Sequence, residues 1–198
     1  MDQTSDLEIS LRNALSHAGS ASSDFDLNKD LPSPKGRTLK PAAVLIGVTK
    51  DAQVILTKRS ARLQHHPGQV AFPGGKQDPT DATLTDAALR EAHEEIGLPP
   101  DLVKPLGTLP PHETVTSYLV TPVLALIQAD FEEVAEAGEV AEIFRVPLAH
   151  ATNPENFRVE GRRWQGYKRH YYAVPFGPYY IWGATARMLR GLAERMNP

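Results

Sequence analysis

The chain has 198 residues, of which 41% are hydrophobic, 23% charged and 7% aromatic, so a single domain with a sizeable core is expected rather than wholesale disorder. With 21 Lys and Arg against 24 Asp and Glu, the formal net charge is -3, which argues against a protein built to bind the nucleic-acid backbone. The absence of cysteine excludes disulfides, thiolate catalysis and Cys-ligated zinc or iron–sulfur centres.

Two further absences bear on the membrane and on secretion. No run of about 18 apolar residues occurs. The N-terminus also lacks the basic and apolar regions of a secretory signal. We therefore expect no membrane-spanning segment and a cytoplasmic location.

The first 40 residues predict a helix followed by a linker. Leu7 and Leu11 lie on one face of an amphipathic helix over residues 4–18, and Ser5 is placed to cap it. Residues 19–40 are rich in Ser, Asp, Pro and Lys, which is typical of a linker or surface wrap. We therefore divide the chain into an N-terminal extension, 1–40, and a main domain, 41–198.

The first half of the main domain predicts a hairpin, a loop and a helix. Residues 42–48 and 53–57 are apolar, β-branched runs separated by a four-residue turn. Residues 66–76 are dense in Gly and Pro and predict a loop with a short strand. Residues 84–97 predict a helix that Gly97 ends.

The second half adds strands and a closing helix. Residues 116–127 predict one or two strands, with Pro122 marking an edge or a bend. Residues 140–146 and 170–175 predict short strands, and 179–196 predict the last helix. This order predicts an α/β fold in which helices cover a mixed sheet.

Three glutamates crowd one face of the central helix. Glu91 is spaced i,i+3 from Glu94 and i,i+4 from Glu95, so their charges repel unless something neutralises them. Oxygen ligands suit Mg²⁺ or Mn²⁺, and Mg²⁺ completes its coordination shell with water and substrate phosphates. A solvated acidic face is the competing interpretation. A preceding glycine pair, Gly74–Gly75, favours the metal site, because glycine lets the backbone approach a phosphate or offer a carbonyl.

The segment from Gly75 onward resembles the Nudix box. The matching residues are Arg90, Glu91, Glu94, Glu95, Gly97 and Leu98. The front half differs, because Asp81 stands where a glutamate is expected and one extra residue follows it. The resemblance implies a Nudix hydrolase domain over 41–198, built as an α/β/α sandwich with a mixed β-sheet and a loop–helix–loop catalytic box. It also implies structural roles for Asp81, which would hold Arg90, and for Gly97.

A second stretch resembles the upstream signature of the coenzyme A diphosphatase branch. Residues 56–60 and 68–75 keep its spacing, but Gln64 stands where that signature has an arginine. The likeness extends from about residue 40 to 190. The implied substrate is coenzyme A, or a thioester or oxidised form of it. The implied products are 4′-phosphopantetheine, acylated or not, and adenosine 3′,5′-bisphosphate.

The resemblance also implies roles for individual residues. A Mg²⁺ or Mn²⁺ ion would be held by the Gly74 carbonyl with Glu91, Glu94 and Glu95, and the catalytic set would be these three glutamates with Arg90. The general base would be Glu94 or Glu91, with Glu139 or Glu142 in reserve. Substrate contacts are expected from Arg59 above all, and then from Ser60, Gly68, Gly75, Lys76 and Lys58.

Other interpretations remain open from the sequence. One is a Nudix enzyme for NADH, a nucleotide sugar or a dinucleoside polyphosphate, which the Gln64 departure allows. Another is a nucleotide-sensing module without catalysis, which the intact glutamate set argues against. The expected partner is a small nucleotide diphosphate, with neither nucleic acid nor membrane. The aromatic residues near Trp182 are expected in the core more than stacked on an adenine.

Overall fold

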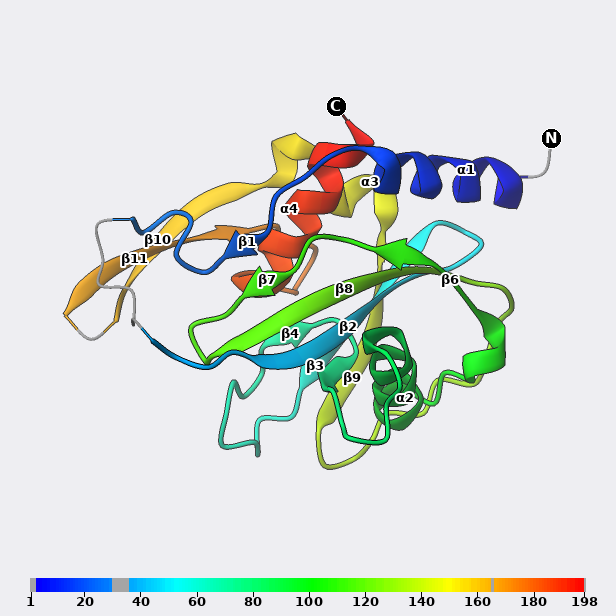
Figure 1. Cartoon of the computed structure of the whole chain (residues 1–198), viewed down its shortest axis with the longest axis horizontal. Coiled ribbons are helices and arrows are strands. Elements are labelled where there is room, and N and C mark those ends of the chain that lie inside the picture. Colours follow the sequence, from blue (N-terminus) through cyan, green and yellow to red (C-terminus); the bar gives the residue numbers. More distant parts are fainter. Residues whose placement is uncertain (1–2, 30–35, 165, 198) are drawn as a thin grey trace.

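A computed structural model describes residues 3–29, 36–164 and 166–197 (Figure 1). The main sheet consists of β1 (Ser22–Ser23), β2 (Lys40–Val48), β3 (Gln53–Arg59), β4 (Val70–Ala71), β5 (Gly74–Lys76), β6 (Val103–Thr108), β7 (His112–Glu113), β8 (Tyr118–Ile127) and β9 (Val140–Pro147). A separate hairpin pairs β10 (Arg158–Trp164) with β11 (Tyr167–Ala173). The helices are α1 (Gln3–Ser16), α2 (Leu84–Ile96), α3 (Leu148–Ala151) and α4 (Ala184–Met196), with 3₁₀ turns η1 (Pro100–Leu102) and η2 (Pro154–Asn156).

The main sheet is mixed and lies between two helical layers. Helices α1 and α4 lie over one face and α2 covers the other (Figure 1). β2 runs parallel to β8, whereas β3 runs antiparallel to β9. Strand alternation supplies both faces, since Leu56 of β3 packs in the core under α1 and α4 while Ile55 packs under α2. The predicted α/β fold, with its helix-covered mixed sheet, is confirmed.

A splay between β2 and β3 creates the opening in which the site lies. The two strands pair at Val48 and Val54, next to the predicted hairpin turn, and then diverge. Farther along, β4 pairs with β3 and β5 pairs with β2, so the 70–76 segment fills the gap. Phe72, only 2% exposed, anchors that segment in the core. The glycine pair that follows is thereby brought against α2.

Three predictions about elements are wrong in detail. Helix α1 begins at Gln3, so Ser5 lies inside it and is not its N-cap. Helix α4 begins at Ala184 rather than 179, because Gly183 has a φ of 66° and donates its N–H to the Tyr172 carbonyl at 3.0 Å, outside the helix. Residues 179–182 instead return beside the end of β11, where Trp182 bridges Ala173.

The third correction concerns Pro122, which is in the interior of the sheet rather than at an edge or bend. β8 is one continuous strand, with β2 on one side and both β6 and β7 on the other. Pairing to β6 ends at Val123 and pairing to β7 begins at Val120. The Pro122 carbonyl accepts from Leu109 N on that side. The missing N–H of Pro122 therefore faces the gap between two partner strands, where no ladder bond is lost.

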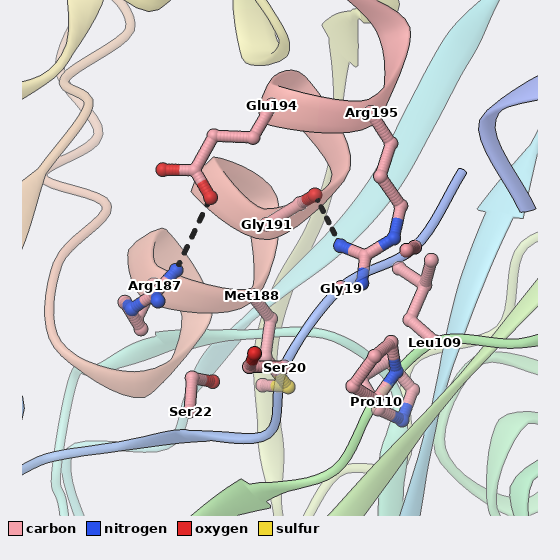
Figure 2. Close-up of a pocket in the computed structure, with 12 residues that line it drawn as sticks. Gly19, Ser20, Ser22, Leu109, Pro110, Arg187, Met188, Gly191, Glu194 and Arg195 are labelled. Atoms are coloured by element: carbon pink, nitrogen blue, oxygen red, sulfur yellow. Dashed lines mark hydrogen bonds and ion pairs between the residues drawn. The ribbon is translucent and has the colours of Figure 1, made fainter. Parts of the chain in front are cut away.

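A cavity of about 220 Å³ lies between the N-terminal segment and α4, on the face of the sheet away from α2 (Figure 2). Arg195 lies at one side of it and donates to the Gly191 carbonyl at 2.6 Å. Its guanidinium covers Gly19 so closely that a Cβ there would be 1.5 Å from a guanidinium nitrogen. A larger residue at position 19 would displace the Arg195 guanidinium, which packs the N-terminal segment against α4.

We expect Leu11→Ala to destabilise the protein strongly. Leu11 is fully buried where α1 packs against α4, so the truncation leaves a cavity in the core. Such changes cost about 2–5 kcal/mol, which corresponds to a fall in Tm of roughly 5–15 °C for a domain of this size. Thermal unfolding followed by circular dichroism measures the effect. Ile9→Ala is the matched control, because Ile9 on the same helix is 54% exposed and its loss should change Tm little.

Candidate active site

Glu95 is a buried carboxylate at the centre of the site. It lies on α2 with 6% exposure, and its Oε2 accepts from the Gly74 amide at 3.4 Å. Burial, together with the neighbouring charge of Glu91, raises the pKa of Glu95 to about 8. The Gly74 amide thus joins the glycine loop to α2. A cation bound to Glu95 would offset the free-energy cost of its negative charge.

Gly75 lets the loop approach the second helix glutamate. A Cβ at position 75 would be 2.4 Å from Glu91 Oε1, closer than any real contact. Burial also raises the pKa of Glu91 above its ordinary value. Glu91 and Glu95 therefore lie side by side beneath the glycine pair, which is the geometry that the spacing i,i+4 dictates.

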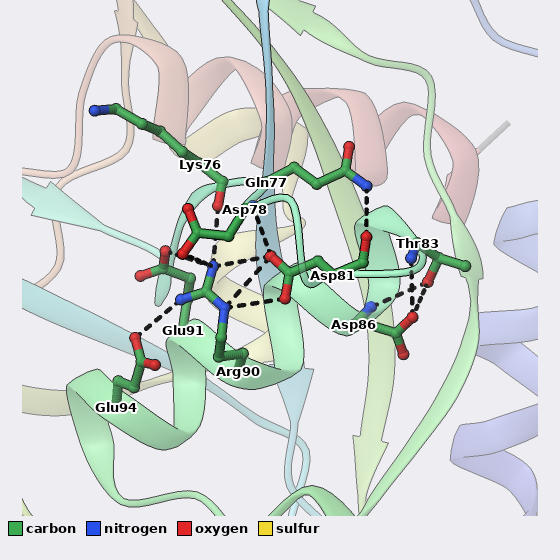
Figure 3. Close-up of polar contacts among 9 residues, drawn as sticks. All are labelled: Lys76, Gln77, Asp78, Asp81, Thr83, Asp86, Arg90, Glu91 and Glu94. Carbon is green, nitrogen blue, oxygen red and sulfur yellow. Dashed lines mark hydrogen bonds and ion pairs between the residues drawn. The ribbon is translucent and has the colours of Figure 1, made fainter.

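Arg90 ties the loop to the helix (Figure 3). Its Nε donates to Asp81 Oδ1 at 3.0 Å, and its Nη1 donates to Glu94 at 2.9 Å. Its Nη2 donates to Glu91 at 3.1 Å and to the Lys76 carbonyl at 3.1 Å. The guanidinium holds the pKa of Asp81 below its usual range. The contact between Asp81 and Arg90 that the shifted box predicts is present.

Two charged residues from other strands face the helix glutamates. Burial is the main cause of the raised pKa values of Glu95 and Glu91; the charge of Arg59, at the end of β3, opposes the rise at Glu95, and the charge of Glu139 adds to the rise at both. A hydrogen bond of 2.7 Å from Ser60 N to the Glu139 carbonyl joins the two segments. Arg59 and Glu139 thus border the carboxylates from the sheet side.

Other predicted residues lie farther from this centre. Lys58 is exposed, and strand alternation places it on the face opposite to Arg59. The Ser60 hydroxyl is buried and accepts from Arg62 N at 3.3 Å. Gly68 has a φ of 68° and closes the turn back to β3. Gln64, His65 and His66 are all exposed on the loop between Ser60 and Gly68.

Two features escaped the sequence interpretation. The Lys76 backbone carbonyl accepts a hydrogen bond from Arg90, and its predicted contact with substrate stays a prediction. Glu142, a reserve candidate for the base, accepts a hydrogen bond from Tyr179. Its side chain points to the α4 side of the sheet, as that of Phe144 does, whereas Ile143 points to the α2 side. No sequence pattern predicts a hydrogen bond to a backbone carbonyl such as that of Lys76. The alternation of side chains along residues 140–146, however, could have placed Glu142 on the face away from α2.

The donor chemistry of the site fits a hard divalent cation. No ready-made group of three acidic or histidine side chains occurs within the described residues, since Glu91 and Glu94 are engaged by Arg90. The available donors are all oxygens, and burial favours the protonated form of Glu95, so that its carboxylate form would be stabilised by a cation bound beside it. Release of the two glutamates from Arg90 would complete the ligand set.

The fold and the oxygen donors of this site fit a hydrolase of phosphate compounds that works with a divalent cation. A family model described as the NUDIX domain matches residues 38–165, and the chain belongs to the Nudix hydrolases, which hydrolyse derivatives of nucleoside diphosphates and generally use divalent metal ions. Within the described residues, no helix has the length and apolar content needed to cross a membrane.

Similar proteins have been named as Nudix hydrolases. The uncharacterized Nudix hydrolase NudL of Enterobacter sp. strain 638 is 42% identical over 160 residues, which is 80% of this chain and 83% of that protein. The uncharacterized Nudix hydrolase NudL of Klebsiella pneumoniae subsp. pneumoniae is 40% identical over 177 residues, or 88% and 92% of the two chains. The crystal structure of the M. smegmatis Nudix hydrolase RenU shares 27% identity with a TM-score of 0.45, covering 58% of this chain and 73% of that one.

We expect Asp81→Ala to lower thermal stability and turnover together. The Asp81 carboxylate is buried against Arg90 and also accepts from Asp78 N at 2.8 Å, so its loss frees both the loop and the guanidinium. Differential scanning calorimetry and a hydrolysis assay measure the two effects. Asp78→Ala is the control, because the Asp78 carboxylate is 57% exposed and 3.9 Å from Arg90. Equal behaviour of the two variants would contradict a structural role for Asp81.

Glu95→Gln should stabilise the metal-free protein while abolishing activity. The folded-state pKa of about 8 lies above that of an unfolded glutamate, so wild-type stability is greatest at low pH and falls as the pH rises towards 8. Glutamine does not ionise and escapes this loss. In EDTA at pH 8.5 we expect the variant to unfold roughly 5 °C or more above wild type, with a smaller difference at pH 5.

The same Glu95→Gln variant should lose at least about a hundredfold in turnover with metal present. Glu94→Gln is the control for stability, because the Glu94 side chain is 55% exposed and its charge costs the fold little. A Glu95→Gln protein that is less stable than wild type in EDTA at pH 8.5 would contradict the buried-charge account.

Proposed function

We propose that the protein hydrolyses the diphosphate bond of coenzyme A, or of its acylated or oxidised forms, to give 4′-phosphopantetheine (or its acyl form) and adenosine 3′,5′-bisphosphate. The observation that supports this substrate is the segment from Leu56 to Gly75, which keeps the spacing of the coenzyme A diphosphatase signature. The fold brings its Arg59 and its glycine pair to the same carboxylate, Glu95. The rest of the domain supplies the general chemistry of the family.

Each group in the site has a defined task. Glu95, Glu91, Glu94 and the Gly74 carbonyl would hold Mg²⁺ or Mn²⁺, which when bound polarises the diphosphate and activates water. Arg59 would neutralise charge on the phosphoryl oxygens, with Gly75 and Gly68 leaving room for the backbone to approach. Asp81 and Gly97 stay structural, since they fix Arg90 and end α2.

The hydrolytic step needs one base. Water attacks a phosphorus atom, the bond from that phosphorus to the bridging oxygen breaks, and the proton of the water passes to a carboxylate. Glu94 or Glu91 is the first candidate for this carboxylate. Glu139 is the second, because its charge faces the helix glutamates, whereas Glu142 points to the opposite face.

One observation favours a second candidate function. Gln64 lies exposed on the loop beside Arg59, where the coenzyme A signature has an arginine. A missing cation at this place would suit a Nudix substrate with less charge, such as NADH, a nucleotide sugar or a dinucleoside polyphosphate. A cytoplasmic location stays a prediction of the sequence.

A panel of diphosphates with Mg²⁺ or Mn²⁺ tests the proposal. The substrates are coenzyme A, dephospho-coenzyme A, NADH, ADP-ribose, a nucleotide sugar and a dinucleoside polyphosphate, with products separated by chromatography. We expect the highest kcat/KM for coenzyme A or an acyl form, with 4′-phosphopantetheine and adenosine 3′,5′-bisphosphate as products. Cleavage of NADH or a nucleotide sugar in preference to coenzyme A would contradict the proposed substrate.

Arg59→Ala should lower kcat/KM for coenzyme A by about ten- to a hundredfold. A charge-assisted hydrogen bond to phosphate is worth about 1.5–3 kcal/mol, and the variant removes it while leaving every proposed metal ligand in the chain. Steady-state kinetics at fixed Mg²⁺ measure the change. Arg145→Ala is the control, since Arg145 pairs with Glu133 at 2.8 Å on the surface of β9. Unchanged kinetics in Arg59→Ala would remove Arg59 from the substrate site.

A further inference from the structure

The β10–β11 hairpin is basic in a chain that is acidic overall. Residues 158–173 contain five Lys or Arg and one acidic residue, whereas the whole chain has a formal net charge of -3. Among the described residues, no carboxylate lies within ion-pair distance of Arg162, which is exposed. The hairpin extends from the side of the molecule where α4 lies (Figure 1). Its positive charge therefore points to an anionic ligand.

The open face of this hairpin is aromatic. Tyr171 of β11 meets Trp182 with ring centroids 5.0 Å apart, and Tyr180 lies 6.4 Å from the same indole. The Arg162 guanidinium lies 5.9 Å over the Trp182 ring. Trp182 is half-buried and Tyr180 is 40% exposed, so this part of the aromatic group is accessible, whereas Tyr172 and Tyr179 pack against the core as the sequence predicts.

Strand alternation separates the two faces of the hairpin. Arg162 has the parity of Glu160, whose carboxylate accepts from the Tyr180 hydroxyl in the aromatic cluster. Arg163 lies on the opposite face of the hairpin, together with Val159, and Val159 pairs in register with Tyr172. The Tyr172 ring lies against Arg187 of α4, 5.8 Å from its guanidinium carbon. Arg162 and Arg163 are therefore neighbouring arginines on opposite faces, and only Arg162 belongs to the aromatic cluster.

The aromatic cluster adjoins the active site through the loop before β4. A Cβ added to Gly183, the residue after Trp182, would lie 3.8 Å from the side-chain nitrogen of Gln69. The Gln69 carbonyl accepts from Arg59 N at 2.9 Å, and Arg59 faces Glu95. In addition, the hydroxyl of Thr185, in the first turn of α4, donates to the Val70 carbonyl at 3.0 Å. The segment Gln69–Val70 thus lies between Arg59 and the residues that directly follow Trp182.

We infer that this face of the hairpin binds the nucleotide end of the substrate, with Trp182 stacking on the base and Arg162 binding the phosphate on the ribose. This rests on the proposed function, because coenzyme A combines an adenine with a ribose 3′-phosphate beyond the diphosphate. The chemistry matches, since an indole face stacks on a base and a guanidinium pairs with a phosphate. Arg162 then supplies a cation that Gln64 does not.

Kinetics of two neighbouring variants test the phosphate contact. We expect Arg162→Ala to lower kcat/KM for coenzyme A by about ten- to a hundredfold and to leave kcat/KM for dephospho-coenzyme A, which lacks the 3′-phosphate, nearly unchanged. Arg163→Ala removes the same charge from the opposite face and should leave the ratio of the two substrates as in wild type. An unchanged ratio in Arg162→Ala, or equal changes in both variants, would overturn the inference.

Fluorescence tests the stacking without turnover. The chain has two tryptophans, so Trp164→Phe leaves Trp182 as the only indole. In EDTA, adenosine 3′,5′-bisphosphate should quench this fluorescence saturably, and 4′-phosphopantetheine should not. Adding Arg162→Ala should raise the Kd for the bisphosphate about tenfold or more, while Arg163→Ala should not. No quenching, or equal weakening by both substitutions, would overturn the inference.

The two proposals fail separately. If wild type cleaves coenzyme A but the Arg162→Ala variant keeps its preference over dephospho-coenzyme A, the subsite is wrong and the proposed function stands. If wild type prefers another diphosphate while Trp182 is still quenched by adenosine 3′,5′-bisphosphate in an Arg162-dependent way, the proposed substrate is wrong and the subsite stands.

Discussion

A buried carboxylate, Glu95, is the constraint around which the domain is organised. Taking an unpaired charge out of water is costly, and the cost is increased here by Glu91 one helical turn away. The arrangement requires the splayed strands that carry the glycine loop to α2 and a Gly75 that leaves room for Glu91. These features place carboxylates where their negative charge costs stability, and the divalent cation that we propose would offset that cost.

Arg90 and the cation compete for the same carboxylates. In the structure, the guanidinium bonds to Glu91 and Glu94 as well as to Asp81. Asp81 is not one of the proposed metal ligands, so it could still hold Arg90 when Glu91 and Glu94 bind a cation. The guanidinium compensates the acidic helix in the structure, and it would still order the loop through Asp81 if the glutamates bound a cation. The contact also shows that an aspartate in a loop one residue longer can reach Arg90 in place of the expected glutamate.

Much of this arrangement can be predicted from local sequence. The run from Arg90 to Gly97 specifies a capped helix with its carboxylates on one face, and the structure has that helix from Leu84 to Ile96. The start of α4 and the position of Pro122 could not be predicted, because both depend on strands distant in sequence: β11 pairs with residues 181–183, and the gap between β6 and β7 accommodates the proline. The aromatic face near Trp182 also arises only when β10 and β11 pair.

Manganese binding tests the central claim, that the α2 carboxylates hold a divalent cation, most directly. Electron paramagnetic resonance of free Mn²⁺ can be followed while wild-type protein, Glu95→Gln and the exposed-site variant Asp78→Asn are titrated in the absence of substrate. The account predicts saturable loss of the free signal with wild type and Asp78→Asn, and an affinity at least about tenfold weaker with Glu95→Gln. Equal Mn²⁺ affinity in wild type and Glu95→Gln, or no binding by wild type, would contradict it.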